Sequence, residues 1–423
     1  MVSDTLFASR RNVLLFYVAS ATVLGAIGSI LGLIKVLSIS KIMPSFQFGF
    51  FQHPYLQVFG FLVIFISGVE VVLAPNFRGI AAVNGKIDYI FLGIMIAFQI
   101  SVFAGNVDSS LFRYTIAASF VFLFLYSLRY NYLDWLGLFR RSRKHDAGDF
   151  FLAFSAFSLL LTSILLYING IRDGKVFNTA LLYEVLLGFS GFVVFGVSIK
   201  TSPSINSRIR STLLYSSLAL GGASIVFSFI EDVMVPGRFL YVIAVLFLLT
   251  ILSFVVAQSM LVIKSRKRSK SDATPKTKAI SIVSYARLCI VLSLAWLIIG
   301  SVIGLFYSLN HSFHLEKIAM IHSIGLGFLG TSIMGYAPLL LPGILSLERH
   351  RTDISIWSLL IFTIGIFFMI TGFSLLPPTS AFPYFLTAGG FLIVAGMLWY
   401  VVDIHRFIVK PVSGHDFNFQ DDW

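Results

Sequence analysis

Four of the eight histidines in this chain of 423 residues lie at or near the start of strongly apolar segments. His53 begins the run HPYLQVFGFLVIF, and His322 lies inside a later run. His311 and His314, three residues apart, occupy the short connection before that later run. Neutral imidazole is the commonest metal ligand in proteins, and two histidines on facing helices can supply both axial positions of a haem iron. These residues therefore point to metal or haem binding.

Each of these histidines also has a simpler interpretation. His53 or His322 alone fits an interfacial or hydrogen-bonded role. Taken as a pair at matched depth, flanked by glycines and aromatic residues, the two are predicted haem ligands, because ionisable groups in membrane helices are functional candidates by default. For His311 and His314 a solvated polar loop is the preferred interpretation, with a second metal site as the alternative. Pro54 leaves open whether a helix begins just after His53 or is kinked there.

A few other ionisable residues lie within or beside apolar segments. Arg113, Arg172 and Arg238 are candidates for pairing with haem propionates, the alternative being interfacial snorkelling. The acidic residues of this kind are Glu70, Glu184, Glu231 and Asp232. The remaining histidines are interpreted as solvated or interfacial; they are His145, His350, His405 and His415.

The composition indicates the kind of element that must position these residues. The chain is 57% hydrophobic and 12% charged, whereas a soluble domain is about 25% charged, and its mean hydropathy is +0.90. A helix crosses a bilayer with about 20 apolar residues. Twelve continuous apolar runs meet this length, at 12–37, 53–75, 87–106, 110–129, 149–170, 178–199, 211–230, 239–263, 285–308, 316–341, 354–376 and 382–406. Continuous rather than alternating runs favour helices over a barrel, so the prediction is an all-α polytopic membrane protein with twelve transmembrane helices.

The basic residues predict the orientation in the membrane. The chain holds 31 lysines and arginines and a net charge of +12. When the N-terminus is placed in the cytoplasm, most of these residues fall in cytoplasmic loops, which is the positive-inside pattern. We therefore expect a multi-pass protein of the cell membrane with both termini cytoplasmic and no cleaved signal peptide. The basicity is explained by topology rather than by nucleic-acid binding.

The chain is predicted to form a single integral membrane domain over 1–423. Helices 1–8 occupy 12–263, helices 9–12 occupy 285–406, and a basic, Ser-rich cytoplasmic linker at 264–278 separates them. This division into eight and four helices differs from the even halves of a major-facilitator transporter. No Walker A, EF-hand, HExxH or GxSxG motif is present, so whether the chain is an enzyme is left open. The single cysteine, Cys289, excludes an internal disulfide and a cysteine-ligated iron–sulfur cluster.

Two segments carry a resemblance to a known family. The first is HPYLQVFGFLVIFISGVEVVLAPNFRG, and the second is YARLCIVLSLAWLIIGSVIGL followed by IHSIGLGFLGTSIMGYAP. They resemble the two signature helices of the NnrS family of twelve-helix membrane proteins: a histidine-containing stretch with a Phe-Gly-Phe turn that ends in Pro-Asn, then an Arg-Leu…Trp helix and an Ala-Leu-His…Gly-Thr run. The order and separation of the two segments agree over nearly the whole chain, although few individual positions match.

The resemblance implies a haem- and copper-containing protein of nitric oxide metabolism or of the response to nitrosative stress. His53 matches the first family histidine, and His322 matches the histidine of the second segment. The family's second histidine is Tyr55 in this chain, and a later family histidine is missing from the segment LLLPGIL. The resemblance therefore supports haem binding more than copper binding.

Three functional readings follow. The leading one is an NnrS-like haem protein that meets nitric oxide or another diatomic ligand, or exchanges electrons with a redox partner, with Phe59, Phe61, Trp296 and Phe328 as pocket walls. The second is an electron-transfer protein like subunit I of haem–copper oxidases and nitric oxide reductases, although such a site needs about six metal-ligating histidines. The third is a twelve-helix transporter without haem, in which Glu70 or Glu184 couples protons.

Overall fold

The structure is a computed structural model of the chain, and it describes most of the residues outside the longer loops and the C-terminal tail. The described residues are 2–44, 52–78, 85–104, 109–139, 145–172, 178–201, 208–234, 237–268, 280–309, 314–344, 353–375, 379 and 381–408.

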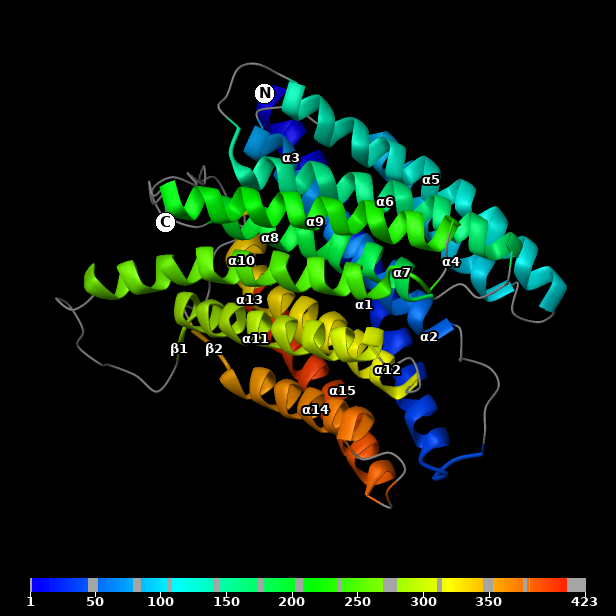
Figure 1. Cartoon of the computed structure of the whole chain (residues 1–423). Coiled ribbons are helices and arrows are strands. Elements are labelled where there is room, and N and C mark those ends of the chain that lie inside the picture. Colours follow the sequence, from blue (N-terminus) through cyan, green and yellow to red (C-terminus); the bar gives the residue numbers. More distant parts are fainter. Residues whose placement is uncertain are drawn as a thin grey trace. The chain divides into compact units, whose positions relative to one another are not determined.

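The predicted fold class is confirmed: the described chain is all-α, with twelve long helices (Figure 1). Over the residues described, ten of these helices are long and apolar enough to cross a membrane. Backbone N–H and C=O groups within a bilayer must be satisfied inside the chain, and a continuous helix does this. The protein is therefore a polytopic helical membrane protein.

The helices follow the predicted apolar runs closely. The first six are α1 (Val2–Ile39), α2–η1–α3 (Gln52–Tyr55, Leu56–Val63, Ile64–Arg78), α4 (Gly85–Ala104), α5 (Ser109–Phe139), α6 (Ala147–Arg172) and α7–η3–α8 (Thr179–Leu182, Tyr183–Gly191, Phe192–Lys200). The last six are α9 (Arg208–Met234), α10 (Leu240–Arg268), α11 (Ile282–Leu309), α12–η5–α13 (His314–His322, Ser323–Gly330, Thr331–Ile344), α14 (Ile356–Leu375) and α15 (Phe382–Ile408). Two short strands, β1 (Ile280–Ser281) and β2 (Asp353–Ile354), pair antiparallel with Ile280 opposite Ile354.

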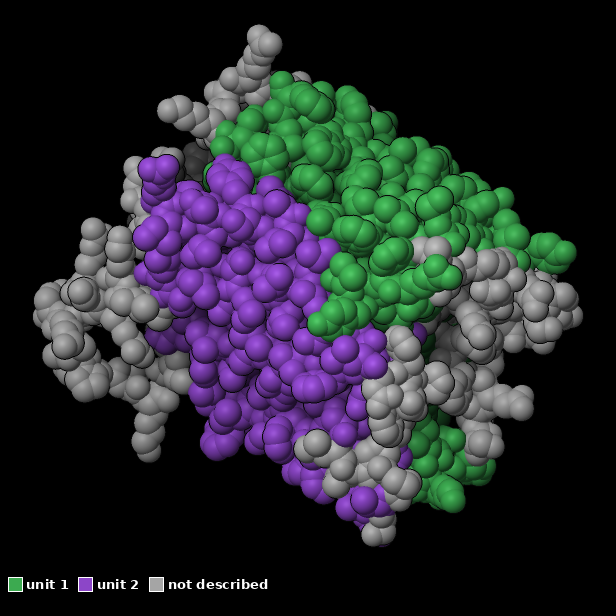
Figure 2. Space-filling view, viewed as in Figure 1, with its two compact units in different colours: residues 1–200, 221–243 green, residues 201–220, 244–423 purple. Residues whose placement is uncertain are grey.

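The chain divides into two compact units, drawn in different colours in Figure 2. Unit 1 comprises residues 1–200 and 221–243, and unit 2 comprises 201–220 and 244–423. α9 and α10 each contribute to both units. α10 extends to Arg268, and residues 269–279 of the connection that follows lie outside the described residues.

Three helices change from α to π geometry along their length, at η1, η3 and η5. A π-helical turn is rare and occurs often at functional sites. The spans that contain these segments are also the most enclosed: 72%, 94% and 72% of their apolar windows are buried, against 33–61% for the other seven described spans. We call these three the inner helices because they are the most enclosed of the described spans, and two of them carry His53 and His322.

Each of the three inner helices has a pair of glycines eight residues apart: Gly60 and Gly68, Gly188 and Gly196, Gly327 and Gly335. In each case both glycines face the long helix that precedes in the chain, which is α1, α6 or α11. A Cβ atom added at Gly60 would lie 3.1 Å from Leu24, and one added at Gly327 would lie 2.7 Å from Trp296. Small residues allow helices in membranes to approach this closely, so the chain uses one design of helix pair three times.

Candidate functional site

His53 lies in the first turn of α2, which begins at Gln52, and Pro54 is tolerated there because a first-turn N–H has no helical partner. The imidazole Nδ1 is 2.8 Å from the backbone oxygen of Gly28 on α1. A carbonyl oxygen only accepts hydrogen bonds, so Nδ1 carries a proton, and in the neutral ring Nε2 therefore carries the lone pair. A Cβ atom added at Gly32 would lie 2.6 Å from Cε1 of the ring, so the imidazole packs directly against the backbone of α1.

His322, in unit 2, ends α12 and immediately precedes the π turn of η5. Its Nδ1 is 2.8 Å from the backbone oxygen of Ile318, one helical turn earlier. The same argument assigns the proton to Nδ1 and the lone pair to Nε2. The ring stacks on Phe373 of α14, with centroids 5.7 Å apart and planes 29° from parallel. The two histidines thus share one arrangement. In each, Nδ1 lies at hydrogen-bond distance from a backbone carbonyl, and the ring packs against a neighbouring helix: the α1 backbone for His53 and Phe373 of α14 for His322.

This arrangement suits metal ligation. A histidine that binds a metal almost always donates its other ring N–H to a carbonyl or carboxylate, which fixes the tautomer and the ring orientation. Two lysines lie on the same helices as these contacts: Lys35 is three residues after Gly32 on α1, and Lys317 is five residues before His322 on α12.

Two buried amides lie beside the His53 region. Gln52 is fully buried and Gln99 of α4 is 2% exposed, and within the described residues neither amide has a hydrogen-bond partner. Gln99 lies close to η1, since its Oε1 would be 3.5 Å from a Cβ atom at Gly60. An unsatisfied buried amide costs about 1–3 kcal/mol, so both side chains are free to hydrogen-bond a polar ligand.

Of the four aromatic residues predicted as pocket walls, Phe59, Trp296 and Phe328 lie in the packed interior. Phe61 is only half-buried and lies against Gly25 of α1. Phe59 packs edge-on against Phe98 of α4, with centroids 5.2 Å apart, and Tyr55 lies 5.7 Å from Phe59. Trp296 packs against Gly327, and Phe328 is completely buried. These residues define the surroundings of η1 and η5 within each unit.

The other predicted ligands are only partly described. His311 lies outside the described residues, and His314 begins α12 with its side chain outside them. Among the side chains described, no three His, Cys, Asp or Glu residues form a group that could hold a metal ion. Because His53 belongs to unit 1 and His322 to unit 2, their joint ligation of one iron stays a prediction.

The arginines proposed as propionate partners are also only partly described. The side chains of Arg113 and Arg172 lie outside the described residues, although both positions are helical. Arg238 is exposed in the turn before α10.

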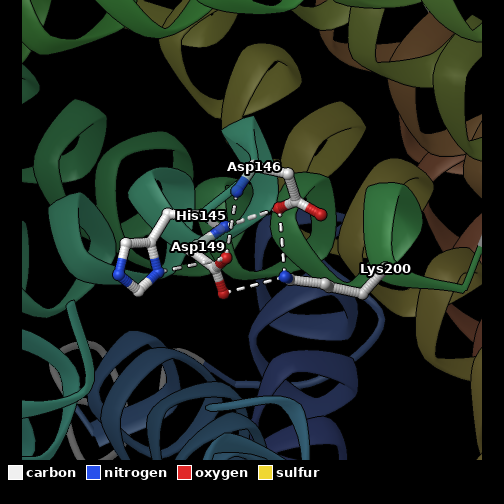
Figure 3. Close-up of polar contacts among 4 residues, drawn as sticks. All are labelled: His145, Asp146, Asp149 and Lys200. Atoms are coloured by element: carbon white, nitrogen blue, oxygen red, sulfur yellow. Dashed lines mark hydrogen bonds and ion pairs between the residues drawn. The ribbon is translucent and has the colours of Figure 1, made fainter. Parts of the chain in front are cut away.

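A second polar cluster joins α6 to α8 within unit 1 (Figure 3). Lys200 Nζ lies 2.8 Å from Asp149 Oδ1 and 3.1 Å from Asp146 Oδ1. The Asp146 N–H donates to Asp149 Oδ2, and the Asp149 N–H donates to Asp146 Oδ1, which is a reciprocal cap of the α6 N-terminus. His145 Nδ1 is 3.7 Å from Asp149. The sequence DAGD ahead of an apolar run was the signal for this cap.

Lys200→Met should lower the free energy of unfolding by about 2 kcal/mol, because it removes the ammonium group that lies 2.8 Å from the buried Asp149 carboxylate. The measurement is chemical unfolding of the purified protein in detergent micelles. Asp146→Asn is the matched control: the Asp146 side chain is 52% exposed, so its loss should have a smaller effect. If the two substitutions lower the free energy of unfolding equally, the Lys200–Asp149 ion pair is not the main stabilising contact of this cluster.

The chain matches no model of a known protein family, and a comparison with curated proteins finds no relative. The resemblance to the NnrS family therefore stays a prediction based on the two segments quoted above.

Proposed function

We propose that this protein is a haem-binding membrane protein in which His53 and His322 ligate haem iron through Nε2. The observation that carries the proposal is common to both rings: each Nδ1 is 2.8 Å from a backbone carbonyl, which leaves the neutral tautomer with its lone pair on Nε2. This is the form that binds a metal, held in the way that metal ligands are held.

Other features of the two sites fit a haem group. Gly32 leaves the His53 ring in contact with the helix backbone rather than with a side chain. The buried amides of Gln52 and Gln99 can hydrogen-bond polar atoms of a ligand. When bound, haem supplies a redox-active iron that passes electrons or binds a diatomic ligand, according to its axial ligands.

We further propose that the diatomic ligand is nitric oxide and that the protein acts in nitric oxide metabolism or in the response to nitrosative stress. This step rests on the resemblance of the two histidine-containing segments to the NnrS family. The same resemblance suggests copper, and His311 and His314 remain candidates for a second metal. The basic loops support an orientation with both termini in the cytoplasm.

The test is the absorption spectrum of protein purified from haem-replete cells, with haem counted by the pyridine haemochrome assay. We expect a Soret band, and a fall in haem per protein to half or less in His53→Ala and in His322→Ala. His145→Ala, in the cluster of Figure 3, is the control and should keep full haem. Absence of haem from the wild-type protein, or full haem in both histidine variants, would overturn the proposal.

The same variants distinguish the two modes of ligation. If the histidines share one iron, either substitution should change the whole spectrum, and the reduced wild-type protein should bind nitric oxide weakly because its iron is six-coordinate. If each binds its own iron, each substitution should remove about half of the haem, and nitric oxide should shift the Soret band of the reduced protein.

A further inference from the structure

Glu184 is a carboxyl group enclosed in the interior of unit 1. It is the second residue of η3, in the most buried of the described spans, and it is 0% exposed. Its Oε1 atom has no hydrogen-bond partner within the described residues. The groups of the described chain that act on it are Ser158 of α6 and Asp232 of α9, and neither is a cation. An ionised carboxylate without a cation is very costly in such surroundings.

The hydroxyl of Ser158 indicates the protonation state of Glu184. Ser158 Oγ is 2.8 Å from the backbone oxygen of Glu184 and 2.8 Å from its carboxyl Oε2. The hydroxyl has a single proton, and the backbone oxygen can only accept one. If Ser158 donates to the backbone oxygen, the contact with Oε2 is satisfied when Oε2 carries a proton and donates to Ser158. The geometry thus suits a neutral carboxylic acid.

The site is shaped by a glycine. Any Cβ atom at Gly188 would overlap the Ser158 hydroxyl, so only glycine at this position lets the hydroxyl reach Glu184. Gly188 corresponds to Gly60 and Gly327 in the other two helix pairs, and four residues before those glycines stand Leu56 and Ser323. The carboxyl is therefore particular to the α6–η3 pair rather than a feature of the repeated design.

A second acidic residue of unit 1, Asp232, has hydrogen-bond partners that suit an ionised carboxylate. Its Oδ2 accepts a hydrogen bond of 2.8 Å from the Asn169 side chain, and its Oδ1 accepts one from the Asn178 side chain. Two amide donors satisfy both oxygens of an ionised carboxyl group. Glu231, beside it, accepts from the Gly237 N–H at 2.8 Å, while its Oε2 has no partner within the described residues. Both oxygens of Asp232 thus have donors, unlike those of Glu184.

We propose that Glu184 is a proton-binding site within the membrane, which holds its proton as a neutral acid. On the other elements packed against η3, Ser158 faces Glu184 from α6, and Tyr130 of α5 contacts η3 through Phe189. This inference is independent of haem binding.

Infrared spectroscopy of the purified protein tests the proposal, because the carbonyl stretch of a protonated carboxylic acid is separate from the amide bands. We expect a carboxylic-acid band that shifts on exchange into D₂O and is lost in Glu184→Gln. Glu316→Gln, at a partly exposed position of α12, is the control and should keep the band. Asp232→Asn should shift the band, since it removes the neighbouring charge.

A second measurement covers the case in which Glu184→Gln fails to fold. Dicyclohexylcarbodiimide labels protonated carboxyl groups in apolar surroundings, and mass spectrometry of wild-type protein identifies the labelled residue. We expect labelling at Glu184 that falls as the pH rises. No label at Glu184, or a carboxylic-acid band that persists unchanged in folded Glu184→Gln, would overturn the proposal.

Discussion

Gly396→Ala should lower the free energy of unfolding by about 2–3 kcal/mol, the effect of overpacking a close contact. A Cβ atom at Gly396 would lie 2.6 Å from the backbone nitrogen of Phe362 and 2.8 Å from its Cα. Backbone atoms cannot rotate aside as a side chain can, so α15 must move away from α14. Cβ atoms added at Gly389 and Gly365 would likewise lie 2.8 Å from the backbone nitrogen of Met369 and 2.7 Å from that of Ile393. If α15 moves away from α14, these two close contacts are lost as well. The measurement is unfolding in mixed detergent micelles.

Gly93→Ala is the control for this prediction. Gly93 lies within α4, and a Cβ atom added there meets no heavy atom within 4 Å. Alanine is favoured over glycine in a helix by about 1 kcal/mol, so this variant should be as stable as the wild type or slightly more stable. If Gly396→Ala is as stable to unfolding as Gly93→Ala, then α14 and α15 do not approach each other as closely as described.

The helices could be predicted from the sequence because a bilayer accepts few solutions for a continuous apolar run. The run predicted at 53–75 lies within the helix Gln52–Arg78, and the run at 178–199 agrees with Thr179–Lys200 to within a residue at each end. The π turns could not be predicted in this way. Hydropathy reports length and apolar content, whereas a π turn depends on how the helix packs against its neighbours.

The repeated helix pair was only partly visible in the sequence. The segments that begin at His53 and His322 resemble each other, but glycine is common in membrane helices and the third copy has no histidine. The contacts of Gly188 with α6 and of Gly60 with α1 show what the copies share. Spacing of eight residues between glycines becomes informative only when both face the same preceding helix.

The sequence was enough to identify the histidines of the candidate site, but it was not enough to identify the groups that contact them. His53 and His322 were identified because histidine is rare in apolar helices. The partner of the His53 ring is Gly28, which lies 25 residues earlier on another helix and offers only a backbone oxygen. Because every residue has a backbone carbonyl, the amino-acid sequence does not show which one accepts this hydrogen bond. Asp149 and Lys200 were missed for a related reason, since their pairing depends on how α6 lies against α8.

Gly32→Ala should reduce haem content to the level found in His53→Ala, if the proposed ligation is right. A Cβ atom at Gly32 would lie 2.6 Å from Cε1 and 2.8 Å from Nδ1 of His53, so the ring must leave its place. It would then lose the hydrogen bond to Gly28 that fixes Nε2 as the ligating atom. Loss of such an orienting contact typically costs 10–100-fold in metal affinity. The measurement is haem per protein, by the pyridine haemochrome assay.

Gly68→Ala separates this effect from a general loosening of the helix pair. Gly68 lies on α3, and its added Cβ atom would overlap Tyr17 of α1, away from His53. Both variants should lose stability by about 1–3 kcal/mol, but only Gly32→Ala should lose haem. Equal haem loss in the two would mean that haem retention follows the packing of α1 rather than the position of the His53 ring. Full haem in a folded Gly32→Ala protein would remove His53 from the ligands, because a displaced imidazole cannot hold the iron.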